Sequence, residues 1–231
     1  TVICSELYDR AVRLGVPEAS IRLIYNGCNT EQVALGRLEA RQLARLPSNG
    51  FYIGYVGSIF YNDAQLMANA FDIVASQNPQ IRLVIAGYFP FDFRELTRFP
   101  GAIYQLGYLE SDILHQVLCS CDLFWLPMQD SNANRGRFPL KLNDYFAAGR
   151  PCIATAVGDV PRLFSAEPVG LICQATPEAL AEKTLLLVED EPLRERLGSH
   201  GRAVAEGAWN WYRKAEELEE IYLRVMQDHM K

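Results

Sequence analysis

The chain has 231 residues with 22 Lys+Arg and 28 Asp+Glu, which gives a formal net charge of −6. This charge excludes a generally basic nucleic-acid-binding protein. The composition, 49% hydrophobic and 22% charged residues, excludes a disordered chain. No stretch approaches 18 uncharged apolar residues and the N-terminus has no signal-peptide pattern, so we expect a soluble protein without a transmembrane segment.

The first 46 residues differ from the rest of the chain. They predict a strand at 1–4, a helix at 6–14, a strand at 22–25, a turn at Asn26-Gly27 and a polar helix rich in Arg, Glu and Gln. We interpret residues 1–46 as the end of a preceding domain and a connection into the domain that follows.

From about residue 50, short β-rich runs alternate with helical patterns. Strands are predicted at 51–57, 81–87, 102–107, 122–127, 151–155 and 169–173, and helices at 62–76, 92–97, 112–119, 139–148 and after the N-cap Thr176. This alternation is typical of βαβ units around a parallel sheet. We therefore predict an α/β fold with a Rossmann-like, doubly wound parallel sheet over residues 47–208.

The C-terminal part is predicted to be helical. A helix starts at Asp190-Glu191-Pro192 and is interrupted at Gly198 and Gly201, and a last helix covers 210–230 within a C-terminal segment of 209–231. The last helix carries an apolar stripe, which we expect to contact the core rather than a partner. Its members are Trp211, Ala215, Leu218, Tyr222 and Val225.

The six cysteines form no CxxC pair, and several lie in apolar runs, so we expect reduced thiols in the core. Cys119 and Cys121 have only His115 nearby, which is too few ligands for zinc. We expect no metal site.

Ligands of open parallel sheets bind beyond the carboxyl ends of the strands. Three predicted strands end there in a glycine: Gly57-Ser58, Gly87-Tyr88 and Gly107-Tyr108. Each glycine equally fits a tight turn without a ligand. Neither GxGxxG after the first strand nor GxxxxGK[ST] is present, which argues against dinucleotide-dependent redox chemistry and against a P-loop NTPase.

The stretch from Asn132 to Thr155 is the most informative. Arg135 and Arg137 precede Phe138-Pro139-Leu140, where a helix is predicted to begin, and Lys141 falls in its first turn. Residues 130–162 include five basic and three acidic residues, although the chain is acidic overall. This pattern predicts a pocket for a pyrophosphate. A solvated basic loop is the alternative.

Asp144 follows Lys141 by three residues on the same predicted helix, so both side chains project from one face. A carboxylate at this point can accept two hydrogen bonds from a vicinal diol such as that of ribose. An ion pair between Asp144 and Lys141 is the alternative.

Several segments together carry a resemblance to a known family. They are RLIYNGCNT, YIGYVGS, YQLGYLESDILHQVLCSCDLFWLP, FPLKLNDYFAAGRPCIAT and WNWYRKAEELEEIY. These segments resemble the donor-binding, C-terminal half of retaining group 1 glycosyltransferases (family 4 type) with the GT-B fold. The final segment resembles the helix that crosses back toward the first domain of that fold.

The resemblance implies residue roles. Asp144 occupies the second acidic position of the family's E-x7-E motif and would hold the ribose, whereas the first acidic position is Gly136 here, for which Asp130, Asn132 or Asn134 are candidate substitutes. The family's Arg and Lys after the first strand are absent from 58–63, so Lys141 and Arg137 are candidates to neutralise the diphosphate. Tyr108, or the backbone around it, would face the base. The candidate binding residues are Gly57, Ser58, Tyr88, Tyr108, Arg137, Phe138, Leu140, Lys141 and Asp144.

The resemblance also implies a function. The chain would bind a UDP-, GDP- or ADP-sugar without a metal or other cofactor, for transfer to a saccharide or lipid-linked acceptor held by a missing N-terminal domain. We expect little or no transfer by these residues alone, and a cytoplasmic location, with membrane contact through the missing domain left open. No catalytic residue is assigned, and His115, His200 and His229 are expected away from the crevice. A non-catalytic nucleotide-sugar-binding module and a sugar-nucleotide epimerase are the alternatives.

Overall fold

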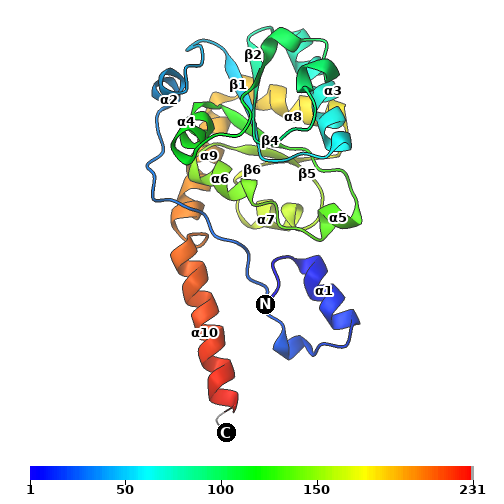
Figure 1. The fold of residues 1–231 in the computed structure, drawn as a ribbon, viewed down its shortest axis with the longest axis vertical. Coiled ribbons are helices and arrows are strands. Elements are labelled where there is room, and N and C mark those ends of the chain that lie inside the picture. The colour runs from blue at the N-terminus through cyan, green and yellow to red at the C-terminus, as the bar shows by residue number, and fades with distance from the viewer. Residues whose placement is uncertain (230–231) are drawn as a thin grey trace.

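A computed structural model describes residues 1–229, with side chains through Gln227. Six parallel strands form one sheet in the order β3-β2-β1-β4-β5-β6 (Figure 1). The strands are β1 (Phe51–Val56), β2 (Ile81–Ala86), β3 (Ile103–Gln105), β4 (Leu123–Leu126), β5 (Cys152–Thr155) and β6 (Gly170–Cys173). The chain winds outward from β1 in one direction and from β4 in the other, so the predicted doubly wound, Rossmann-like sheet is confirmed.

Helices cover both faces of the sheet. One face carries α3 (Tyr61–Gln77) and α8 (Pro177–Glu189), and the other carries α2 (Arg37–Leu43), α4 (Ser111–Ser120), α6 (Lys141–Ala147) and α7 (Val160–Ala166). A further helix, α9 (Glu191–Glu206), contributes side chains to the cores on both faces. Side chains alternate along each strand. In β4, Leu123 and Trp125 join the core under α3 and α8, whereas Phe124 and Leu126 join the opposite core. All six cysteines are buried and free, as predicted.

The helix starts follow the sequence signals where a capping residue is present. The Thr176 hydroxyl accepts from the Ala179 amide at 3.2 Å, and the Asp190 carboxylate accepts from the Leu193 amide at 2.8 Å. The predicted interruption of the following helix is wrong, because α9 runs continuously through Gly198 and Gly201. A Cβ at Gly198 would lie 2.5 Å from the Gly149 carbonyl oxygen, so this glycine serves close packing.

Other boundaries also differ from the prediction. The strands expected at 1–4 and 22–25 are reduced to a single bridge between Val2 and Leu23. The helix expected from 139 begins at Lys141, after a turn in which the Leu142 amide donates to the Pro139 carbonyl. Two α-helices of the described residues were not predicted: α5 (Asn132–Arg135), within the expected basic loop, and α7.

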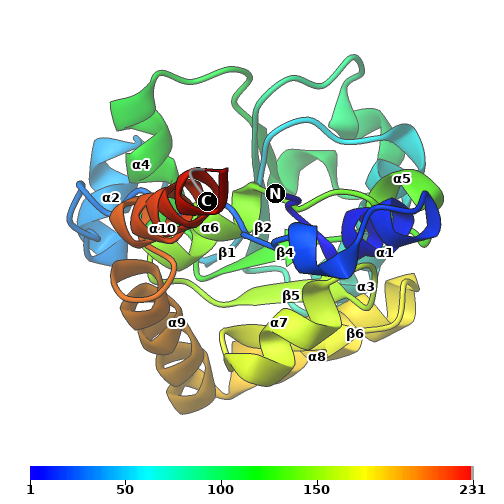
Figure 2. The same ribbon diagram turned by 90° about the horizontal axis from the view of Figure 1, so that it is seen from below.

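The first and last segments extend beyond the sheet. α1 (Ser5–Arg13), followed by the 3-10 turn Glu18–Ser20, and α10 (Trp211–His229) lie at the same end of the molecule (Figures 1 and 2). The chain passes twice between this end and the sheet. The two passages are joined where the Trp211 amide donates to the Cys28 carbonyl at 3.3 Å. Residues 230 and 231 of the predicted last helix and C-terminal segment lie outside the described residues.

The apolar stripe of α10 does not contact the core, contrary to expectation. Trp211 is 48%, Tyr222 60% and Val225 49% exposed. The periodicity correctly identifies the apolar face of α10, but within residues 1–227 no other element packs against most of the length of this helix. Across residues 1–229, no helix combines the length and the hydropathy required to cross a bilayer.

Candidate binding cleft at the carboxyl edge of the sheet

The site lies where the winding direction of the sheet reverses. β1 pairs with β2 as far as Val56 and Ala86, but with β4 only at Ile53–Leu123 and Gly54–Phe124. β1 and β4 therefore separate toward their carboxyl ends. In open α/β sheets this point of divergence is where ligands bind.

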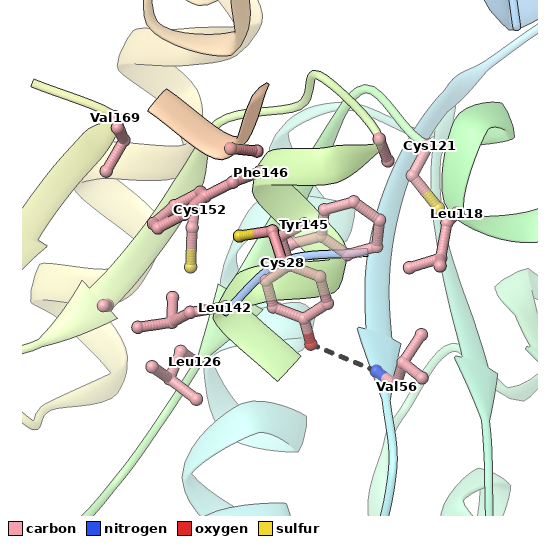
Figure 3. Close-up of a cluster of buried hydrophobic side chains, with 14 of the residues drawn as sticks. Cys28, Val56, Leu118, Cys121, Leu126, Leu142, Tyr145, Phe146, Cys152 and Val169 are labelled. Carbon is pink, nitrogen blue, oxygen red and sulfur yellow. Dashed lines mark hydrogen bonds between the residues drawn. The ribbon is translucent and has the colours of Figure 1, made fainter. Parts of the chain in front are cut away.

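Tyr145 of α6 fills the base of this divergence (Figure 3). The Val56 amide, which has no partner on β4, donates to the Tyr145 hydroxyl at 3.1 Å. The Tyr145 ring stacks on Phe124, with centroids 3.9 Å apart and planes 3° apart. Gly54 leaves room for this stack, because a Cβ there would lie 2.2 Å from the Phe124 ring. The start of α6 is thereby held against the end of β1.

Lys141 reaches from the first position of α6 across the end of β1. Its ammonium donates to the Tyr55 hydroxyl and to the Ser58 carbonyl at 3.3 Å, and lies 4.0 Å from the Tyr55 ring centroid. The Tyr55 hydroxyl itself donates to the Ser58 carbonyl at 2.9 Å. The cation is thus fixed beside the loop Gly57-Ser58, in a cation–π contact.

Two titratable groups of α6, Lys141 and Asp144, have pKa values near neutrality. Burial lowers the pKa of Lys141 to about 7, and the neighbouring Arg137 adds to this effect while Asp63 and Asp144 oppose it. Burial raises the pKa of Asp144 to about 6, against the effect of Lys141. Groups perturbed in this way by desolvation in a cleft are candidates for a functional role.

A lobe of about 320 Å³, which we call the polar lobe because three charged side chains line it, opens between α6 and the end of β1. It is lined by Val56, Gly57, Ser58, Arg137, Phe138, Pro139, Leu140, Lys141 and Asp144. The Arg137 guanidinium lies 5.4 Å from the Phe60 ring centroid, and its Nε is buried without a hydrogen-bond partner among the described residues. This lobe presents two cationic side chains and one carboxylate to the same volume.

An apolar lobe of about 290 Å³ adjoins it and shares Val56, Gly57 and Ser58. Its remaining lining residues are Ala86, Gly87, Tyr88, Tyr108, Leu109 and Leu114. Tyr88 is 70% and Tyr108 83% exposed, so both rings are accessible to a ligand. The loop at Gly57 forms the boundary between a charged and an apolar compartment.

All nine candidate binding residues line one or both lobes. The alternative ion pair is absent among the described side chains, because the Lys141 ammonium and the Asp144 carboxylate are more than 4 Å apart. Asp130 and Arg135 pair with each other and line a separate hollow with Ser5, outside both lobes.

His115 lies closer to the cleft than expected. It lines a cavity of about 100 Å³ to which Asp144 also contributes, and its Nε2 lies 2.9 Å from the Val33 carbonyl oxygen. Tyr55, which contacts Lys141, and Tyr145, which contacts the end of β1, were not predicted as parts of the site. Tyr55 lies in a predicted strand and Tyr145 in a predicted helix, and no local signal in the sequence shows which groups their hydroxyls contact.

The sheet order and the cleft at the reversal point define a Rossmann-like domain whose cleft lies where open α/β sheets bind ligands. The family described as "Glycosyl transferases group 1" matches residues 50–190, more than half of the chain. The chain belongs to this family.

Individual relatives agree with this assignment. The capsular polysaccharide biosynthesis glycosyltransferase CapM of Staphylococcus aureus is 26% identical over 214 residues, covering 88% of this chain and 54% of CapM. Among solved structures, a glycosyltransferase from Rickettsia africae superposes with a TM-score of 0.78 at 16% identity, covering 97% of this chain and 62% of that one. The structure of Anabaena HepE in complex with UDP and glucose superposes with a TM-score of 0.77 at 16% identity, covering 95% of this chain and 61% of HepE. The fold is therefore that of GT-B C-terminal domains, and the chain spans about three fifths of the length of these structures.

Proposed function

We propose that this chain binds the nucleoside-diphosphate-sugar donor of a retaining glycosyltransferase, and that transfer to a saccharide or lipid-linked acceptor requires a further domain. Residues 1–46 would then end that domain and connect it to the donor domain at 47–208, and residues 209–231 would return toward it. The observation that carries the proposal is the pair of adjoining lobes at Gly57-Ser58, one charged and one apolar. The two compartments match the diphosphate and the base of one ligand.

Each part of the donor has a chemically suited partner. Lys141 and Arg137 would bind the diphosphate with charge-assisted hydrogen bonds, and Asp144 would accept from the ribose hydroxyls. The base would lie in the apolar lobe between Tyr88 and Tyr108. Lys141 and Arg137 would also stabilise the charge that develops on the leaving diphosphate, which is an electrostatic form of catalysis and needs no metal ion.

The known proteins support a nucleotide-sugar donor. Structures of HepE contain UDP and UDP-glucose, and a mannosyltransferase of Corynebacterium glutamicum that is 27% identical over 153 residues, 64% of this chain and 40% of the relative, is described as GDP-mannose-dependent. We leave the choice among UDP, GDP and ADP to measurement.

A non-catalytic binding module is the second candidate, because Gly136 stands at the first acidic position of the motif. In an E-x7-E enzyme that carboxylate would contribute to binding the donor sugar. Nuclear magnetic resonance of the products formed from each donor, with the full-length protein, separates the candidates: transfer or hydrolysis supports the enzyme, and binding without turnover supports the module.

Asp144→Asn is expected to weaken nucleoside diphosphate binding about ten- to a hundredfold, since a charge-assisted interaction of about 1.5–3 kcal/mol is lost. Titration calorimetry with UDP, GDP and ADP measures this. A 2′-deoxynucleotide provides the matched control, because it should bind the parent more weakly but lose little further affinity in the variant. Equal affinities of parent and variant for the ribonucleotide would remove Asp144 from the ribose role.

Nucleotide affinity is expected to be greatest between about pH 6 and pH 7. Below about 6 Asp144 in the free protein becomes protonated and accepts fewer hydrogen bonds, and above about 7 Lys141 loses the charge that attracts the diphosphate. Calorimetry across pH 5 to 9 checks the profile. In Lys141→Met only the decrease in affinity above about pH 7 should disappear. An affinity of the parent that does not change across this range contradicts the roles given to Lys141 and Asp144.

A further inference from the structure

A carboxylate of the sheet domain holds the N-terminal helix. Asp159, which is 6% exposed, precedes α7 but does not cap that helix with its side chain. It accepts instead from the Ser5 amide at 2.8 Å and from the Ser5 hydroxyl, at the start of α1. Resting on the proposed function for the ligand, we propose that Asp159 and Tyr25 couple the docking of α1 to the binding cleft, so that docking and nucleotide binding favour each other.

α1 has few other attachments to the rest of the protein (Figure 1). None of its residues is buried, and among the described residues it shares no extensive contact with another helix or strand. Its N-cap residue makes no side-chain hydrogen bond to the helix, so Asp159 serves as the cap from 154 positions away. The backbone bridge between Val2 and Leu23 closes residues 1–24, which we call the α1 unit, into one piece. The bond between Ser5 and Asp159 therefore largely decides where this unit lies.

Tyr25 follows the α1 unit directly and contacts two aromatic rings. Its ring centroid lies 5.4 Å from that of Phe138 and 5.8 Å from that of Trp209, on which it stacks with planes 13° apart. The Phe138 and Trp209 rings also contact each other, with centroids 5.9 Å apart. Phe138 lines the polar lobe next to Arg137. The Tyr25 ring therefore supports a wall of the polar lobe.

The chain that follows Tyr25 is fixed to α6. Asn143 of α6, which is 4% exposed, donates from Nδ2 to the Gly27 carbonyl at 2.7 Å. A Cβ on Gly27 would lie 2.8 Å from the Cα of Trp211, so this passage has no free space. Because the chain is held after Tyr25, a displacement of the α1 unit must be taken up at Tyr25 itself.

The sign of the coupling follows from what docking keeps in place. With the α1 unit docked, the Ile24 amide donates to the Val2 carbonyl at 2.9 Å, which holds the chain immediately before Tyr25. Release of the unit frees the Tyr25 ring, and Phe138 with its neighbour Arg137 gains room to move away from the diphosphate position. Nucleotide binding therefore favours the docked unit, and by linkage docking favours binding by the same factor.

Asp159→Ala removes the attachment and is the first test. By calorimetry with UDP, GDP and ADP, the nucleotide that the parent binds should bind this variant about three- to tenfold more weakly. Asp190→Ala is the matched control. Asp190 also caps a helix, through the Leu193 amide at 2.8 Å, but it lies at the start of α9 and lines neither lobe. It should leave nucleotide affinity unchanged.

The ring of Tyr25, rather than its hydroxyl, should carry the effect. The hydroxyl is buried and has no hydrogen-bond partner among the described residues. Tyr25→Phe should therefore bind nucleotide like the parent, whereas Tyr25→Ala should show the same loss as Asp159→Ala. The double variant Tyr25→Ala with Asp159→Ala should lose little further affinity, because both changes interrupt the same coupling.

Hydrogen exchange of the Ser5 amide, followed by nuclear magnetic resonance, measures docking directly. The amide donates to Asp159 in the parent, so Asp159→Ala should accelerate its exchange, whereas Asp190→Ala should not. Saturating nucleotide should slow the exchange of Ser5 in the parent about three- to tenfold, because the coupling is reciprocal.

Ser5→Pro keeps the coupling testable if Asp159→Ala does not fold. Proline removes both donors to Asp159 but suits the first position of a helix, and Cys4 before it is already extended. Asp159→Ala or Ser5→Pro with the affinity of Asp190→Ala, or Ser5 exchange that nucleotide does not slow, overturns the coupling. A parent that binds none of UDP, GDP and ADP overturns the proposed function instead. Equal Ser5 exchange in the ligand-free parent and in Asp159→Ala overturns the attachment of α1, whatever the ligand.

Discussion

Lys141→Met is expected to weaken nucleoside diphosphate binding about ten- to a hundredfold and, at the same time, to raise the melting temperature. The loss of affinity follows from removing a charge-assisted bond to the diphosphate, about 1.5–3 kcal/mol. The gain in stability follows from burial. An unfolded lysine has a pKa of about 10.4, whereas in the fold burial lowers that of Lys141 to about 7.

The sign of the stability effect depends on pH. Between about pH 7 and pH 10 the unfolded state binds more protons at Lys141 than the folded state, so the stability of the parent rises with pH over this interval. The cost of holding the ammonium is fully present below about pH 7 and disappears above about pH 10. The gain in stability of Lys141→Met over the parent should therefore be largest near pH 6 and shrink toward pH 10.

Thermal denaturation at pH 6, 8 and 10, together with calorimetry of UDP, GDP and ADP, measures both effects. Lys183→Met is the control, because Lys183 lies on α8 and pairs with Glu182 at 2.9 Å, away from the cleft. It should change neither nucleotide affinity nor the pH dependence of stability. A Lys141→Met protein that binds nucleotide like the parent, or melts at a lower temperature at every pH, contradicts the proposed placement of this cation.

Gly87→Ala is expected to destabilise the fold by about 2–4 kcal/mol and to lower the melting temperature by roughly 4–16 °C. Gly87 has a φ of +126°, and a Cβ on it would lie 2.7 Å from the carbonyl oxygen and 2.9 Å from the Cα of Gly57. The neighbour is backbone and cannot turn away like a flexible side chain. Relief of the clash requires the loop after β1 to move.

The same substitution should deform the cleft, because Gly87 joins the ends of three strands. Its amide donates to the Gly107 carbonyl at 2.7 Å, and the Gly57 amide donates to the Ala86 carbonyl at 2.8 Å. Gly107→Ala is the control: Gly107 also has a positive φ, +68°, but no atom lies within 4 Å of its Cβ position. It should cost only about 1 kcal/mol. Equal melting temperatures for the two variants would refute the close approach of Gly87 to Gly57.

The sequence by itself determined the sheet and its binding edge. Alternating β and helical periods predicted six parallel strands, and glycines at three strand ends marked the edge at which the loops gather. The spacing of Lys141 and Asp144 on one helix predicted that both would project together, and both line the polar lobe. These features depend on short-range periodicity, which one strand or one helix expresses without reference to the rest of the fold.

The tertiary structure alone decided which residues surround that pair. Tyr55 and Lys141 are 86 positions apart, and their contact follows from how α6 packs across the end of β1. The hydrogen bond from the Gln129 amide to the Asp63 carboxylate likewise joins residues that are 66 positions apart. The apolar stripe on α10 is a further example: its periodicity identifies an apolar face, but only tertiary packing decides whether another element covers that face. Local patterns fix the face on which a side chain lies, whereas distances between distant segments depend on the whole sheet and its helices.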